Sequence, residues 1–123
     1  MKHSLSKSQR LRGKQVFQKL FAEGSQKAAY PVALRYRWTP DVPGVRMAVG
    51  VSRRRFKHAA DRNRLKRRLR EAYRRQQQAF PQHTGLELLF IYMPRHEVPY
   101  PELARAVAKL ARELHNAPSP PAL

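Results

Sequence analysis

Apolar residues recur at helical spacing in three segments of the chain. Residues three or four positions apart share one side of an α-helix, so each segment predicts a helix with one buried side. Gly24 is a stop signal for the first helix, Pro81 lies beyond the second, and Pro101 fits the first turn of the third. In chain order the apolar groups are Val16, Phe17, Leu20 and Phe21; Leu65, Leu69, Ala72 and Tyr73; and Leu103, Val107, Leu110 and Leu114.

Other segments have the pattern of β-strands. Residues 30–38 and 45–52 alternate apolar with polar or small side chains, which is typical of strands with one buried face. Residues 86–93 are almost continuously apolar, which predicts an interior strand covered on both faces. Residues 25–29 fit either a turn or a short edge strand. We expect the two alternating strands to form an antiparallel pair, in an α+β fold with helices packed on a small mixed sheet.

The length of 123 residues corresponds to one domain. Residues 1–12 are polar and basic without periodicity, and we expect them to form a flexible basic arm. Residues 13–115 hold all the periodic segments and are the predicted α+β domain. Residues 116–123 are rich in proline with little to bury, which predicts a disordered tail. Cysteine is absent from the sequence, so disulfides and thiolate metal sites are excluded.

Charge is the dominant feature of the composition. Lys and Arg number 26 against 8 acidic residues, giving a net charge of +18 and a pI near 11.5. So much positive charge repels itself in a folded domain, which predicts an anionic partner. Nucleic acid is the usual one, and an anionic membrane surface is the alternative. No apolar run reaches the roughly 20 residues of a membrane span, and the N-terminus lacks the apolar core of a secretion signal. We therefore expect cytoplasmic nucleic-acid binding without a membrane.

Basic side chains concentrate on the second predicted helix and the segment before it. Residues 53–75 hold 12 of the 26 Lys and Arg residues, and most are Arg, whose planar fork matches phosphate oxygens. Any single Arg here could be an ordinary solvated helix charge, whereas the whole face requires anions between its charges. Asn63, inside the run, can bond a base edge or a phosphate. The predicted RNA-binding residues are Arg53, Arg54, Arg62, Asn63, Arg64, Lys66, Arg67, Arg68 and Arg70.

Phe17 and Phe21 lie four residues apart on the first predicted helix, beside Val16 and Leu20. One interpretation places all four side chains in the core. The other places the two Phe rings along a groove, where they stack on unpaired bases. The pattern alone leaves both open.

Catalytic chemistry is not apparent in the sequence. The acidic residues are scattered, mostly one per element, whereas a metal-dependent nuclease needs carboxylates that converge on the ion. The histidines lack the spacing of zinc ligands, and no nucleophile motif or phosphate-binding Gly loop is present. We therefore predict no catalytic and no metal-binding residues in the protein.

The run VGVSRRRFKHAADRNRLKRRLREAYR resembles the signature of the bacterial ribonuclease P protein subunit. That signature joins a strand ending in two basic residues to a helix with the pattern RNR-x-KR-x-x-RE. The segments VFQKLF at residues 16–21 and FIYMPR at residues 90–95 resemble the family's first helix and last strand. The resemblance covers roughly residues 10–115. Arg53 and Arg54 stand where Lys-Lys is more usual, which keeps the charge.

The resemblance implies a fold and a function. The fold would be an αβββαβα two-layer sandwich similar to ribosomal protein S5, with a left-handed βαβ crossover around the central basic helix. The chain would bind the catalytic RNA of ribonuclease P, which removes the 5′ leader of precursor tRNA using Mg²⁺ held mainly by the RNA. The RNR helix would face that RNA, and no obligatory protein partner is implied. The leader would lie in a cleft that includes Phe17 and Phe21, with Arg35 near a further cleft position.

A ribosomal or other structural RNA-binding protein is the alternative, because it would share the charge and the α+β build. The spacing of the RNR motif and the aromatic pair favour the ribonuclease P subunit. A stand-alone enzyme is disfavoured by the scattered carboxylates.

Overall fold

The computed structural model describes residues 9–82 and 84–116 of the chain. Its helices and strands follow the predicted αβββαβα order, with a short 3₁₀ turn, η2, after the second helix. In chain order they are α1 (Lys14–Glu23), β1 (Ser25–Ala29), β2 (Val32–Trp38), β3 (Val45–Gly50), α2 (Ala59–Gln76), η2 (Gln77–Ala79), β4 (Leu86–Tyr92) and α3 (Tyr100–His115).

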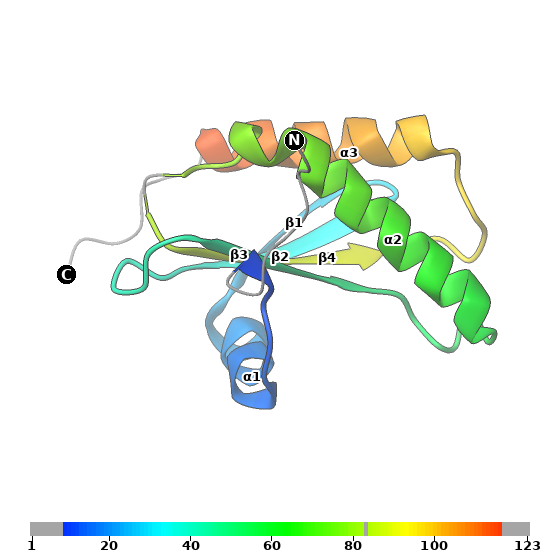
Figure 1. Cartoon of the computed structure of the whole chain (residues 1–123), viewed down its shortest axis with the longest axis horizontal. Helices are drawn as coiled ribbons and strands as arrows, with labels where there is room; N and C mark the ends of the chain where they lie inside the picture. The colour runs from blue at the N-terminus through cyan, green and yellow to red at the C-terminus, as the bar shows by residue number, and fades with distance from the viewer. Residues whose placement is uncertain (1–8, 83, 117–123) are drawn as a thin grey trace.

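The sheet separates two unequal layers. Figure 1 shows α2 and α3 together on one face of the sheet and α1 on the other. Alternate residues of each strand point to opposite faces, so each strand contributes to both layers. The main core lies between the sheet and α2 with α3, and it contains the whole predicted apolar group of α2. The arrangement confirms the α+β sandwich expected from the sequence.

The strand order is β1-β2-β4-β3, in which β2 is antiparallel to β1 and β4, and β3 is parallel to β4. The expected pairing of residues 30–38 with 45–52 is therefore wrong, because β4 lies between β2 and β3. An alternating pattern shows which face of a strand is buried but does not identify its neighbour. The almost continuously apolar β4 takes an interior position, where both of its faces are covered.

A second, smaller core lies on the α1 side of the sheet. It consists of Leu11, Leu20 and Leu89, with partly buried apolar neighbours. Leu20 is the only fully buried residue of α1. One side of α1 is thus anchored while much of its apolar surface stays accessible.

Residues 9–12 belong to the folded domain, although the sequence suggested a flexible arm up to residue 12. Leu11 is buried, and its backbone N–H donates to the Met47 carbonyl of β3 at 2.8 Å. This bond and the apolar contact together fix the segment along the edge of β3. The rest of the predicted arm, residues 1–8, and the predicted tail from residue 117 lie outside the described residues.

Glu87 of β4 is the only buried acidic residue in the described part of the chain, with 2% of its surface exposed. It sits opposite Arg37 of β2 and Arg46 of β3 in the strand register. Arg37 donates to both carboxylate oxygens at 3.0 and 3.3 Å, and Arg46 donates at 3.1 Å. Two cations on one carboxylate offset the cost of burying it and join three strands.

Candidate nucleic-acid interface

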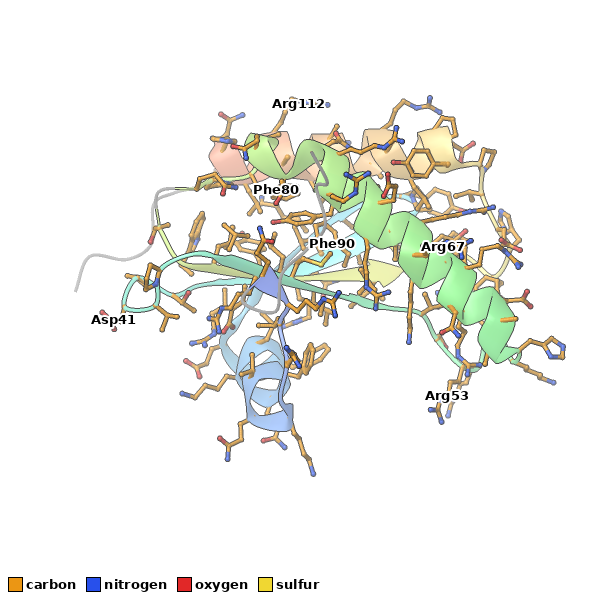
Figure 2. All side chains as sticks on the ribbon, viewed as in Figure 1. Asp41, Arg53, Arg67, Phe80, Phe90 and Arg112 are labelled. Atoms are coloured by element: carbon orange, nitrogen blue, oxygen red, sulfur yellow. The ribbon has the colours of Figure 1, made fainter. Side chains whose placement is uncertain are left out.

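The central helix α2 turns its apolar side to the main core and its basic side to solvent. Leu65, Leu69, Ala72 and Tyr73 are buried, as the sequence predicted. Asn63, Arg67 and Arg70 are exposed on the opposite side. Figure 2 shows Arg67 on this helix, well away from Arg112 on α3.

Arg64 and Arg68 on one edge of α2 are already neutralised within the protein. Arg64 donates to Glu97 at 2.6 and 2.9 Å and to Asp61 at 2.7 Å, and Arg68 donates to Glu97 at 3.3 Å. The hydrogen bonds that Arg64 donates lower the pKa of Glu97, and its bonds to Glu97 and Asp61 raise the pKa of Arg64. Glu97 lies between β4 and α3, so these bonds hold that loop against α2.

Arg62 also makes bonds within the protein. Its guanidinium donates to the backbone carbonyls of Phe56 and Lys57 at 2.8 and 2.9 Å. The bonds tie the basic connector before α2 to the first turns of the helix. Arg53 and Arg54 remain exposed on this connector, in the position that the sequence predicted for RNA binding.

At the other end of α2, Glu71 is held by two arginines. Arg74 donates to both of its oxygens, and Arg75 donates to one at 2.8 Å. These hydrogen bonds lower the pKa of Glu71 to about 2. Arg74 and Arg75 are therefore less available to an outside anion than their positions on the helix suggest.

The remaining basic residues of α2 form a strip that we call the central strip: Asn63, Lys66, Arg67 and Arg70. Within residues 9–82 and 84–116, no ion pair involves any of its three cations. Their charge is therefore uncompensated by acidic side chains and can bind phosphate. The folded protein thus divides the nine residues predicted from the sequence into free and internally bonded groups.

Arg70 also lines a hollow of about 200 Å³ with Arg10 and Arg12, next to β3. Sequence reasoning missed Arg10 and Arg12 because the segment was expected to be a flexible arm. The signal was the single apolar Leu11 between two arginines, which is the alternation of an extended segment with one buried side. The basic surface of α2 therefore continues onto the edge of the sheet.

On the other face of the sheet, Phe17 and Phe21 occupy different environments. Phe17 is partly buried and packs against the small core, whereas Phe21 has 53% of its surface exposed. Phe17 therefore fits the core interpretation in part, whereas Phe21 is accessible, as the groove interpretation requires. Ala48 and Ile91, also partly buried beside this core, supply further apolar surface from β3 and β4. We call the surface formed by α1 and these two strands the α1 cleft, after the leader cleft that the family resemblance implies.

Arg35 of β2 fastens the end of α1 to the sheet. Its guanidinium donates to the carbonyls of Phe21 at 2.8 Å and Gly24 at 3.3 Å, and it lies 5.2 Å from the centre of the Phe21 ring. Carbonyls at a helix C-terminus carry partial negative charge, so a cation suits this position. The structure therefore brings Arg35 and Phe21 together and gives Arg35 a structural contact at the cleft.

A basic hollow adjoins the α1 cleft where β3 and β4 end. Its volume is about 530 Å³, and Ile91, which packs on the small core, also lines it. Arg54, Arg55 and Arg95 come from the connector and from the segment after β4. Of these, only Arg54 was predicted as a site residue. Arg55 and Arg95 become recognisable once the parallel pairing of β3 with β4 places their segments at one end of the sheet.

The acidic residues near this surface do not fit a protein-held magnesium site. Mg²⁺ requires oxygen ligands that converge on it. In the described part of the chain, no three residues among His, Cys, Asp and Glu lie together in a metal-binding group. Glu71, Glu87 and Glu97 each bond to two arginines instead.

Every helix in the described part of the chain is too short or too polar to span a membrane.

The fold and these surfaces define a small α+β RNA-binding protein with a basic helix on one layer and accessible aromatic side chains on the other. The model of the Ribonuclease P family matches residues 5–115, so the chain belongs to that family. This confirms the resemblance seen in the sequence and connects the chain with tRNA processing.

Relatives agree with this assignment, and solved structures share the fold. The ribonuclease P protein component of Chlorobium phaeobacteroides is 34% identical over an alignment of 130 positions. The alignment covers 93% of this chain and 88% of that protein. That of Porphyromonas gingivalis W83 is 42% identical over 72 residues, 57% of this chain and about half (53%) of that relative's length. The ribonuclease P protein from Thermotoga maritima has a similar fold, with a TM-score of 0.73 at 24% identity, covering 85% of this chain and 96% of that one. For the Staphylococcus aureus protein the TM-score is 0.74 at 17% identity, covering 87% and 95%.

Proposed function

We propose that this chain is the protein subunit of a ribonuclease P holoenzyme that removes the 5′ leader of precursor tRNA. The central strip and the exposed Arg53 and Arg54 bind the catalytic RNA. The α1 cleft takes the single-stranded leader, with bases against the Phe17 and Phe21 rings. Leader phosphates beyond the α1 cleft contact the arginines of the basic hollow. The cytoplasm, where precursor tRNA is processed, is the proposed location.

One observation carries the proposal: uncompensated cations and accessible aromatic rings lie on different layers of one small domain. Unpaired bases stack on aromatic side chains, whereas structured RNA is held mainly through its phosphates. A protein with both surfaces can hold a folded RNA and a single strand at the same time. Precursor tRNA bound to a catalytic RNA presents this combination, because its leader is single-stranded.

The chemical step is assigned to the RNA. The described carboxylates are bonded to arginines or separated from one another, so they do not provide a metal-assisted hydrolytic centre. When bound, Mg²⁺ supplies the activated water and stabilises the leaving oxygen, with its ligands mainly from RNA. The protein neutralises phosphates beside that centre and holds the leader, which favours binding of precursor over product.

Reconstitution tests the proposal. The purified chain is added to in vitro transcribed ribonuclease P RNA and a precursor tRNA at low Mg²⁺ concentration, and cleavage at the mature 5′ end is followed on a gel. We expect faster cleavage and tighter binding of precursor than of mature tRNA. Unchanged cleavage refutes the proposed function, and cleavage by the protein without RNA refutes the assignment of the chemistry to RNA.

A pair of charge variants provides a matched control. Arg67→Gln with Arg70→Gln removes two free cations from the central strip, and Arg74→Gln with Arg75→Gln removes two cations that Glu71 already neutralises. The first variant should lose most of the stimulation at low Mg²⁺, and the second should retain most of it. Equal losses would mean that net charge, rather than the central strip, supports the RNA.

A further inference from the structure

Tyr30 is an exposed aromatic residue at the tip of the β1–β2 hairpin, with 62% of its surface accessible. The pairing of Ala29 with Val32 leaves Tyr30 and Pro31 as the loop residues. Tyr30 precedes Pro31 across a cis peptide bond, which is the arrangement of a type VI turn. Neither hydrophobic core includes Tyr30. The fold therefore presents the ring to solvent without using it for packing.

The outer side of α3 carries a row of cations. Arg105, Lys109 and Arg112 follow one another at helical spacing and are exposed, opposite the buried stripe of this helix. Figure 2 shows Arg112 on the outer side of α3 and Arg53 on the other side of the molecule. Within the part of the chain that the structure describes, none of the three cations forms an ion pair.

The ring and the cations meet in one hollow of about 420 Å³. Tyr30, Arg105 and Lys109 line it, together with the small residues Ala29 and Ala106. Glu102 is the one acidic residue of its lining, so two cations face a single carboxylate. We call Tyr30, Arg105 and Lys109 the α3 patch. It combines an open π-face with a net positive charge. The hairpin reaches the same end of the sheet as the basic hollow, because the Met93 N–H donates to the Pro31 carbonyl at 3.0 Å, but the two hollows share no lining residue.

We propose that the α3 patch is a second RNA-binding surface, where one unpaired base stacks on Tyr30 and the flanking phosphates contact Arg105 and Lys109. Base stacking on an aromatic ring beside cations is how proteins bind single-stranded RNA without sequence preference. An acidic protein would pair with the cations but would give the ring no particular role. The patch belongs to neither the central strip nor the α1 cleft. The chain can therefore hold an additional RNA segment, beyond those in its proposed function.

Photocross-linking locates this contact directly. The full chain is mixed with a single-stranded oligouridylate that carries one 5-iodouridine, irradiated, and digested for mass spectrometry. We expect a cross-link at Tyr30 in addition to cross-links in the α1 cleft. As a control, replacing Lys14 and Lys19 of α1 by Gln removes two positive charges from the other layer of the molecule. This variant should leave the Tyr30 cross-link unchanged. Cross-links confined to Phe17 and Phe21 overturn the proposal.

Affinity measurements separate stacking from charge. With Phe21→Ala as background, to weaken the cleft, Tyr30→Ala should reduce oligouridylate affinity about 5- to 150-fold, the loss of one stacked base. Tyr30→Phe keeps the ring and should retain the affinity. Replacing Arg105 and Lys109 by Gln should reduce the slope of log affinity against log salt by about 1.4, since a single strand contributes roughly 0.7 per phosphate.

Three results would refute the inference. The first is unchanged affinity in Tyr30→Ala, and the second is an equal loss in Tyr30→Ala and Tyr30→Phe. The third is a dimer in sedimentation that the patch variants abolish without changing oligouridylate affinity. That result would mean that the α3 patch joins two copies of this chain. Thermal melting of each variant checks that the fold is intact. None of these measurements uses tRNA cleavage, so the inference and the proposed function can fail separately.

Discussion

The salt dependence of RNA binding should distinguish two α2 arginines that the sequence alone treats as equivalent. Arg67 has no acidic partner in the described part of the chain, whereas Arg64 already donates to Glu97 and Asp61. When Arg67 binds a phosphate, it displaces counterions from the RNA. A phosphate that binds Arg64 must first displace carboxylates. Arg67→Gln should therefore change the salt slope much more than Arg64→Gln.

The size of the effect follows from counterion release. Each phosphate contact contributes about 0.9 to the slope of log affinity against log salt for a duplex. Between 50 and 200 mM salt, one contact therefore changes affinity by about 3.5-fold. We expect Arg67→Gln to lose this full increment of salt sensitivity. Arg64→Gln should lose less than half of this increment. Glu97 and Asp61 already neutralise Arg64, so this side chain presents little net positive charge to the RNA.

Binding of fluorescently labelled ribonuclease P RNA, measured by anisotropy over a series of KCl concentrations, tests this difference. The wild-type slope is the reference, and thermal melting shows whether each variant is folded. Equal slope changes would mean that phosphate displaces Glu97 and Asp61 without cost, which refutes our division of the helix. An unchanged slope in Arg67→Gln would remove the central strip from the RNA interface.

Three further variants test other parts of the structure. Phe17→Ala should weaken precursor tRNA binding by the holoenzyme by about 1–3 kcal/mol and leave mature tRNA binding unchanged, since only the precursor has a leader; equal losses would instead mark Phe17 as a core residue. Glu87→Ala should lower the free energy of unfolding in urea by roughly 3 kcal/mol, because it leaves Arg37 and Arg46 side by side without their carboxylate; a neutral result would show that solvent screens the two cations. The stabilising charge of Glu71, whose pKa is lowered to about 2 from 4.5, is fully present above pH 4.5 and is lost as the pH falls towards 2. The stability difference between wild type and Glu71→Gln should therefore shrink over that range, and a constant difference in urea titrations would contradict the ion pair.

The sequence predicted the elements of the fold because their patterns depend on local spacing. The apolar group on α2 and the continuous run of β4 identify their buried sides without knowledge of their neighbours. The sheet order depends on which strands meet, and alternation in β2 and β3 carries no information about that. The insertion of β4 between them could therefore not be read from the pattern. The family resemblance supplied the element order and the βαβ crossover around the central helix, which agrees with the parallel pairing of β3 and β4.

For the candidate site, the sequence identified the basic helix but not how its charges are divided. Arg62, Arg64 and Arg67 are equally basic in the sequence, and their partners come from the connector, from the loop after β4, or from none of the described residues. Glu97 lies 33 positions from Arg64 along the chain, so no short-range pattern links them. Contacts between distant segments decide which cations remain free.

The two edges of the sheet are protected from pairing with other strands in different ways. An exposed edge presents unpaired N–H and C=O groups and invites aggregation. At one edge, β1 is short and polar and includes Lys27, features that discourage a further strand. At the other, β3 is more apolar, and the segment with Arg10 and Leu11 lies against it at Met47. The residues that place Arg10 beside Arg70 thus also cover part of the β3 edge, so we expect removal of residues 9–12 to lower solubility as well as charge.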